Sequence, residues 1–152
     1  MSVWTRADGF SVSDETARLD RERVYGWISE SYWAAGIPRD VFERSVANAM
    51  CFGIYAPDGA QVGFARVMTD RATFGYLGDV FVVPEMRRRG LSKFLLDTIF
   101  AHPELQGFRR WSLATRDAHA LYKRYGFTPL AEPTRYMERA DPHVYSRLRA
   151  GA

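Results

Sequence analysis

The stretch of residues 79–100 constrains this chain most, because a strand-like run passes directly into a helix-like one. Residues 80–83 are β-branched and aromatic, as in a buried strand, and Pro84 ends the run because proline has no amide to donate. Apolar residues then recur with helical spacing, at positions 91, 94, 95 and 99. The sequence therefore predicts a strand that ends at Val83 and a helix that begins near Arg88.

The turn between this strand and this helix carries three arginines and a glycine, namely Arg87, Arg88, Arg89 and Gly90. The first amides of a helix have no partner inside the helix and lie at the positive end of its dipole. Gly90 has no side chain to hold a ligand off the backbone, and arginines make charge-assisted hydrogen bonds to phosphate oxygens. We predict that residues 88–93 bind a pyrophosphate, with Arg87 near it. A merely solvated charge run is the alternative.

Length and composition predict one globular domain over residues 1–152. A hydrophobic fraction of 47% and a charged fraction of 26% are ordinary for such a domain. The net charge of +3 is small, and arginines outside the triplet are spread along the chain, so we expect no nucleic-acid surface. No apolar run approaches the roughly 20 residues of a membrane span, and the N-terminus lacks a signal-peptide pattern. We therefore expect a cytoplasmic protein without a membrane partner.

Cysteine and histidine usage predicts neither a disulfide nor a metal site. The single cysteine, Cys51, excludes an intrachain disulfide and sits in a strand-like run, where we expect it to be a buried apolar residue. The three histidines, His102, His119 and His143, lack the spacing of metal ligands, so no metal is expected.

The remaining patterns predict a mixed, mostly antiparallel sheet flanked by helices, in the α/β (α+β) class. A first strand, expected at a sheet edge, covers residues 9–13, and two helices follow Asp20 and Pro38. The turn triplet 57–59 joins two strands as a hairpin. Further strands are expected at residues 51–55, 61–68, 73–83, 110–114, 127–130 and 134–137, with another helix after Asp117. The element order is β-α-α-β-β-β-α-β-α-β.

Two motifs resemble those of one known family. Residues 87–92, Arg-Arg-Arg-Gly-Leu-Ser, resemble the acyl-CoA signature of the GNAT superfamily of N-acetyltransferases, Arg/Gln-x-x-Gly-x-Gly/Ala. Ser92 departs from the third fixed position, but serine is small enough for a phosphate to approach. Residues 118–127, AHALYKRYGF, resemble the family's Ala-x-x-Leu-Tyr pattern followed by Gly-Phe, with Tyr122 in the tyrosine position. The N-terminal third resembles the family only in element order. The resemblance implies the GNAT three-layer fold.

The resemblance also implies a reaction, in which an amine attacks the thioester of acetyl-CoA directly within a ternary complex. The acceptor would be a primary amine of a small molecule or peptide. The sequence agrees, because nothing around the only thiol resembles a nucleophile motif. Backbone groups of Val80, Phe81 and Val82 would hold the acyl group where their strand splays from its neighbour, with Val82 as the candidate oxyanion donor. The residues implied to bind the pyrophosphate are Arg88, Arg89, Gly90, Leu91, Ser92 and Lys93, with Arg87 beside it.

Candidate catalytic residues follow from the same resemblance. Tyr122 would protonate the leaving thiolate, since phenol and thiol have pKa values of about 10 and about 8.5, and a core tyrosine is the alternative. Asp79 would be the general base, with a structural carboxylate or a water chain as alternatives. Gly78 replaces the glutamate of polyamine-type members, which puts a polyamine substrate in doubt. Thr115 stands where relatives often hold pantetheine with an asparagine.

The acceptor side is the least defined part of this reading. Tyr32 and Trp33 lie at the end of the first predicted helix and either line a substrate pocket or pack in the core. A non-catalytic acyl-CoA-binding or interaction module with the GNAT fold is the alternative function. The acceptor amine and the oligomeric state cannot be read from these residues.

Overall fold

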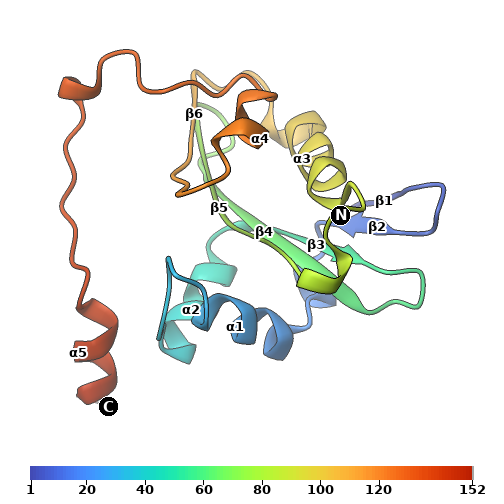
Figure 1. Ribbon diagram of the computed structural model, residues 1–152, viewed down its shortest axis with the longest axis horizontal. Coiled ribbons are helices and arrows are strands. Elements are labelled where there is room, and N and C mark those ends of the chain that lie inside the picture. The colour runs from blue at the N-terminus through green and yellow to red at the C-terminus, as the bar shows by residue number, and fades with distance from the viewer. Residues whose placement is uncertain (152) are drawn as a thin grey trace.

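The computed structural model describes residues 1–151, so the last residue of the predicted domain, Ala152, lies outside them. A six-stranded sheet in the order β1-β2-β3-β4-β5-β6 forms its middle layer (Figure 1). Neighbouring strands are antiparallel from β1 to β5, and β6 is parallel to β5. The strands are β1 Val3–Thr5, β2 Ser11–Ser13, β3 Met50–Tyr55, β4 Gln61–Thr69, β5 Phe74–Val82 and β6 Arg110–Ser112.

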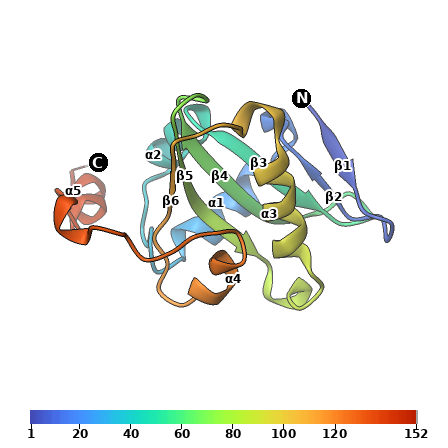
Figure 2. The same cartoon turned by 90° about the horizontal axis from the view of Figure 1, so that it is seen from above.

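Helices cover both faces of this sheet, which confirms the predicted three-layer fold. On one face lie α1 Arg21–Ser29 and α2 Arg39–Ala47, and on the other lie α3 Leu91–Ala101 and α4 His119–Lys123 (Figure 2). A fifth helix, α5 Val144–Ala150, stands apart from the sheet (Figure 1). The apolar side chains accordingly form two clusters, one around α3 and one around α1 and α2.

Helix α3 packs through the apolar face that its spacing predicted. Its buried apolar side chains are each at most 2% exposed and comprise Leu91, Leu95, Leu96 and Ile99. The helix begins at Leu91, whereas the sequence placed its start near Arg88. Arg88 and Gly90 have φ angles of 64° and 71°, in the left-handed region that a right-handed helix excludes. The arginine triplet therefore lies in a loop before the helix.

The N-terminal prediction needs correction. Residues 3–5 form β1, which the sequence analysis missed, and β1 pairs with β2 in a hairpin. The strand predicted at residues 9–13 is β2. It was expected at the sheet edge, but it lies between β1 and β3, because β1 pairs with its outer side. Val12 is accordingly fully buried.

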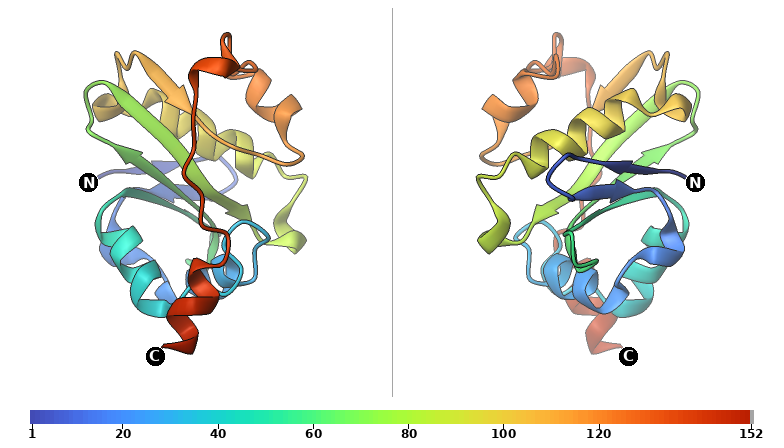
Figure 3. Two further views of the ribbon diagram at one scale, coloured as in Figure 1. Left: turned by 90° about the vertical axis from the view of Figure 1, so that its left-hand side faces the viewer. Right: turned by 90° about the vertical axis from the view of Figure 1, so that its right-hand side faces the viewer.

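The predicted last strands, residues 127–130 and 134–137, are also wrong for the chain that the structure describes. Residues 133–135 form one 3-10 turn, and residues 128–143 are all exposed. They run outside the body from α4 to α5 (Figure 3). Strand propensity is overridden because Pro129 and Pro133 cannot donate amides to a sheet ladder. Among the described residues, strand β6 pairs on one side only, with β5.

Candidate active site

Strands β5 and β6 separate at one end of the sheet. Their pairing runs from Phe74 with Arg110 to Tyr76 with Ser112, where β6 ends. Strand β5 continues to Val82, so its last residues have no neighbour on that side among residues 1–151. A stretch of backbone donors and acceptors is therefore available to a ligand.

The direction of these backbone groups follows from the strand geometry. The Val83 amide donates to the Val62 carbonyl at 2.9 Å, toward β4. Successive amides of a strand point to opposite sides, so the Val82 amide points to the open side. The Val82 carbonyl accepts a hydrogen bond from Arg87 Nε at 3.0 Å on that side. Within residues 1–151, the amide of Val82 thus has no strand neighbour and lies beside Arg87.

Asp79 lies at a β-bulge of β5. Pairing with β4 shifts register between Phe64 and Arg66, so Asp79 and Val80 together oppose one residue of β4. Asp79 has a φ angle of 55°, a left-handed conformation that aspartate tolerates better than most residues. The bulge changes the direction of β5 just before its unpaired end.

The loop after β5 leads into a row of unpaired amides. Phe94 is the first residue after Arg87 whose amide bonds to a backbone carbonyl, that of Gly90 at 3.0 Å. The six amides before it, in residues 88–93, donate no hydrogen bond within the part of the chain that the structure describes. Such a row at the start of a helix attracts an anion.

The charged side chains of this loop differ in their contacts. All three arginines are exposed, but Arg87 turns back to the Val82 carbonyl, and its guanidinium lies 5.6 Å from the Phe81 ring centroid. Lys93 pairs with Asp97, one turn along α3, at 2.6 Å. Among the basic side chains of residues 87–93, Arg88 and Arg89 are therefore the ones free to approach a ligand at the amide row.

Sequence reasoning missed Arg6, which supports this loop from the β1–β2 hairpin. Arg6 Nη1 donates to the Arg89 carbonyl at 3.0 Å, and its guanidinium lies 5.6 Å from the centroid of the Phe94 ring. Asp8 holds the same guanidinium at 2.7 Å. No local pattern signals this role, because Arg6 and Arg89 are far apart in the sequence.

Tyr122 lies in the buried cluster that contains Val82 and Leu91, and it is 8% exposed. Burial, with a smaller contribution from Tyr32, raises its pKa to about 12. Within residues 1–151 its hydroxyl makes no hydrogen bond. The phenol is therefore protonated at neutral pH and available to a ligand.

Asp79 connects the bulge to the loop after α1. One carboxylate oxygen accepts from Trp33 Nε1 at 2.7 Å and the other from Arg66 Nε at 2.5 Å. The side chain of Asp79 is 9% exposed and that of Arg66 is 20% exposed. Asp79, the candidate general base, is therefore hydrogen-bonded directly to Trp33, a candidate residue of the site for the acceptor amine.

The aromatic residues predicted on the acceptor side form a partly exposed cluster with an arginine that was not predicted. Tyr32 and Trp33 are 46% and 44% exposed and meet edge to face, with ring centroids 5.1 Å apart. The Arg116 guanidinium lies 3.8 Å from the Tyr32 centroid, and its amide donates to the Tyr32 hydroxyl at 3.1 Å. Thr115 Oγ1 accepts from the Ala118 amide at 3.1 Å, at the start of α4.

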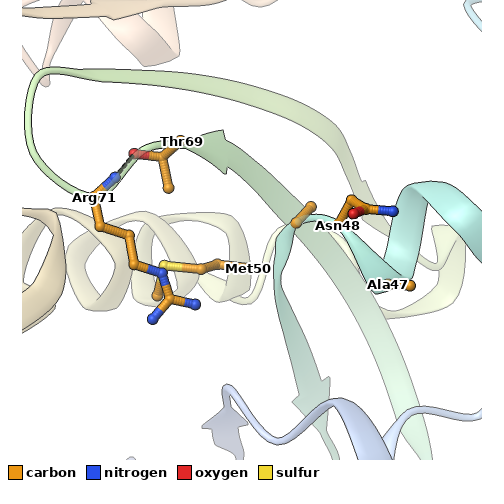
Figure 4. Close-up of a pocket in the computed structure, with 6 residues that line it drawn as sticks. Ala47, Asn48, Met50, Thr69 and Arg71 are labelled. Atoms are coloured by element: carbon orange, nitrogen blue, oxygen red, sulfur yellow. Dashed lines mark hydrogen bonds between the residues drawn. The ribbon is translucent and has the colours of Figure 1, made fainter.

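Two cavities lie among the described residues, and the second is lined by Tyr32 and Trp33 of this site. One of about 220 Å³ lies beside Met50, Thr69 and Arg71, near the start of β5 (Figure 4). The other, of about 280 Å³, lies between residues 32–35 and residues 141–145. Across residues 1–151, no three His, Cys, Asp or Glu side chains gather as metal ligands would. None of the helices there is long and apolar enough to cross a membrane.

Comparison with known proteins identifies the family. The family model of the acetyltransferase (GNAT) domain matches residues 48–129. An acetyltransferase candidate of Gibberella zeae is 30% identical over 141 residues, covering 78% of each chain. The crystal structure of a GNAT-family candidate from Xanthomonas campestris is 51% identical, with a TM-score of 0.87 over 90% of this chain and 96% of the other.

A more distant structure shares the fold alone. An acetyltransferase candidate from Clostridium acetobutylicum, solved with acetyl-CoA, has a TM-score of 0.61 at 14% identity, covering 86% of this chain and 94% of its own. One conclusion follows from three findings. Strands β5 and β6 separate beyond Tyr76, residues 88–93 present a row of unpaired amides at the start of α3, and the matches above are to GNAT proteins. The chain belongs to the GNAT family of acetyltransferases.

Proposed function

We propose that this protein transfers an acetyl group from acetyl-CoA to a primary amine of a small molecule or peptide. The observation that carries the proposal is the row of six unpaired amides, residues 88–93, directly after the unpaired end of β5. A pyrophosphate at the amide row would direct the rest of the cofactor toward β5. Arg88 and Arg89 would add charge-assisted hydrogen bonds.

The open side of β5 suits the acyl end of the cofactor. The Val82 amide points away from β4. It can therefore donate to the thioester carbonyl, and more strongly to the oxyanion that forms when an amine attacks. Val80 presents its backbone on the same side, because alternate residues of a strand share a direction. Backbone donors here need little reorganisation, since β4 fixes the other side of the strand.

Tyr122 is the proposed acid for the leaving thiolate. With its pKa at about 12 and a thiol pKa of about 8.5, proton transfer would be uphill by about 5 kcal/mol in the absence of other effects. This difference between the two pKa values is larger than the difference between an ordinary phenol and an ordinary thiol. The buried surroundings also raise the pKa of a thiol, which narrows the gap. A hydrogen bond from the phenol would stabilise the developing thiolate before the proton moves.

Removal of the amine proton is better assigned to a water chain than to Asp79 directly. Both carboxylate oxygens of Asp79 already accept hydrogen bonds, from Trp33 and Arg66. Taking a proton would weaken the ion pair with Arg66. In this proposal Asp79 holds Trp33 at the acceptor side, and exposed Tyr32 and Trp33 contact the carbon skeleton of the amine.

Titration calorimetry with acetyl-CoA tests the cofactor part of the proposal. Arg88→Glu/Arg89→Glu should weaken binding at least about tenfold, since each lost charged hydrogen bond is worth about 1.5 kcal/mol or more. Arg23→Glu/Arg44→Glu makes the same change in net charge on α1 and α2, and should bind like the wild type. Absence of binding by the wild type would exclude the proposed function.

Turnover separates the enzyme from a non-catalytic acyl-CoA-binding module. Release of free CoA in the presence of a panel of primary amines is expected for the enzyme. A protein that binds acetyl-CoA but releases no CoA with any amine would be the binding module instead. With a working acceptor, Tyr122→Phe should lower the rate about 100-fold, the lower range for general acid catalysis. An unchanged rate would remove Tyr122 from the mechanism.

A further inference from the structure

Arg116 lies in the loop between β6 and α4, just beyond the place where β5 and β6 separate. Its guanidinium lies 3.8 Å from the ring centroid of Tyr32, which comes from the loop between α1 and α2. Its amide also donates to the Tyr32 hydroxyl at 3.1 Å. The two contacts therefore join loops attached to helices on opposite faces of the sheet (Figure 2).

The contact with Tyr32 holds the Arg116 guanidinium in place but leaves its hydrogen-bond donors unused. An arginine carries five N–H donors in a planar fork that matches two oxygens of a carboxylate or phosphate. A cation–π contact needs no hydrogen-bond acceptor, so it uses none of these donors. Arg116 is exposed, and within residues 1–151 it forms no ion pair, not even with the adjacent Asp117. The guanidinium is thus positioned and open to a ligand.

The carboxylates of the acceptor side are already paired with cations. Asp79 pairs with Arg66 at 2.5 Å, and Asp141, which lines the second cavity, pairs with Arg147. A second positive charge on the acceptor would find neither carboxylate free, and Arg116 would repel it. Of these five charged side chains, Arg116 is the one without a partner of opposite charge among the described residues. The charge balance here favours an anionic group on the ligand.

The same cluster reaches the unpaired end of β5, where we propose that the acyl group lies. The Tyr32 ring meets the Trp33 ring edge to face, and Trp33 Nε1 donates to Asp79 of β5 at 2.7 Å. Burial, and then the charge of Tyr32, raise the pKa of Tyr122, so Tyr32 also lies near the proposed acid. An acceptor with its amine at the end of β5 can therefore extend along the exposed rings toward Arg116.

We infer that the acceptor amine also carries an oxyanion, a carboxylate or a phosphate, and that Arg116 binds this group. The inference rests on the proposed function and narrows its substrate class. The amine lies at the unpaired end of β5, the carbon skeleton lies against Tyr32 and Trp33, and the oxyanion accepts hydrogen bonds from the Arg116 guanidinium. Amines that end in a neutral or positive group instead leave Arg116 without a partner and are poorer acceptors.

A binding experiment tests the inference without turnover. The probes are matched sets of linear amines with two to six carbons, each ending in a carboxylate, a phosphate, a hydroxyl or a second amine. They are titrated into nitrogen-15-labelled protein saturated with CoA, and NMR follows the Nε–H signal of Arg116. Carboxylate or phosphate probes should shift this signal and bind at least about tenfold more tightly than the alcohols of equal length. The stronger of the two anions identifies the class of oxyanion.

Variants separate recognition of the oxyanion from a structural role of Arg116. Arg116→Gln should weaken binding of the anionic probes at least about tenfold and leave the alcohols unchanged, whereas a structural defect weakens both. Arg116→Lys keeps the charge and should retain part of the preference. Arg44→Gln removes another exposed arginine, on α2, and should bind like the wild type. Equal binding of anions and alcohols by the wild type, or equal losses in Arg116→Gln, would overturn the inference.

Kinetics places the effect within the reaction. With an anionic acceptor, Arg116→Gln should raise KM at least about tenfold and leave kcat nearly unchanged, because Arg116 contacts a group that does not react. Arg116→Glu should reverse the preference toward diamines of the same length. The two proposals fail differently. Binding of acetyl-CoA without a preference for anionic amines removes the oxyanion inference and leaves the proposed function, whereas absence of acetyl-CoA binding removes both.

Discussion

Replacing Asp79 by asparagine should destabilise the fold measurably, because it removes one member of a largely buried ion pair. Breaking a fully buried pair typically costs about 3–5 kcal/mol. Here Arg66 is 20% exposed and reaches some water, and asparagine still accepts a hydrogen bond from Trp33, which reduces the expected loss to about 2–3 kcal/mol. For a domain of this size the loss corresponds to a Tm decrease of roughly 4–12 °C.

Urea denaturation followed by tryptophan fluorescence and circular dichroism measures this loss. The companion variant Arg66→Met/Asp79→Asn leaves no orphaned charge, so its loss should be smaller than the sum of the two single losses. Glu104→Gln, which breaks the exposed pair with Arg71, is the control and should cost less than about 1 kcal/mol. If Asp79→Asn changes stability by less than about 0.5 kcal/mol, or the two losses add, the pair does not hold the bulge as argued.

Two further predictions use shifted pKa values. Burial opposes ionisation of Asp14, but the His102 ring at 2.8 Å and the Ser2 amide together hold its pKa below the ordinary value. Stability from Asp14 is therefore present above pH about 4 and lost as pH falls through the lowered pKa, and Asp14→Asn should flatten the acid limb of denaturation curves. Burial raises the pKa of Cys51 to about 12, so at pH 8 only about one thiol in ten thousand is ionised. Thiol reagents should label Cys51 only in denaturant, and rapid labelling of the native protein would contradict its burial.

Local patterns predicted the parts of the fold that depend on neighbours in the sequence. The run before Pro84 and the apolar spacing after Gly90 correspond to β5 and α3, because strand ladders and buried helix faces repeat every few residues. The amide row followed from the same reasoning, since every helix start leaves amides unpaired. The predicted start of α3 near Arg88 was wrong, because the left-handed conformation of Arg88 has no sequence signal.

Contacts between distant segments could not be read in this way. The sequence named Asp79, Tyr32 and Trp33 separately, and only the fold joins Asp79 to Trp33 and Arg66. Arg6 and Arg116 take part in the site region through neighbours far along the chain. Their roles depend on where hairpins and loops pack, and many sequences with the same local pattern pack them differently.

The sequence by itself determined the strand, turn and helix that present a row of amides, and the family motifs that surround them. The tertiary structure decided which side of β5 is open, which charges neutralise one another and where the last segment goes. Residues 127–137 illustrate the difference, since their strand propensity is real but Pro129 and Pro133 interrupt it and the chain leaves the sheet after α4. Propensity is local, whereas the path of the chain past the sheet is decided by the packing of the whole molecule.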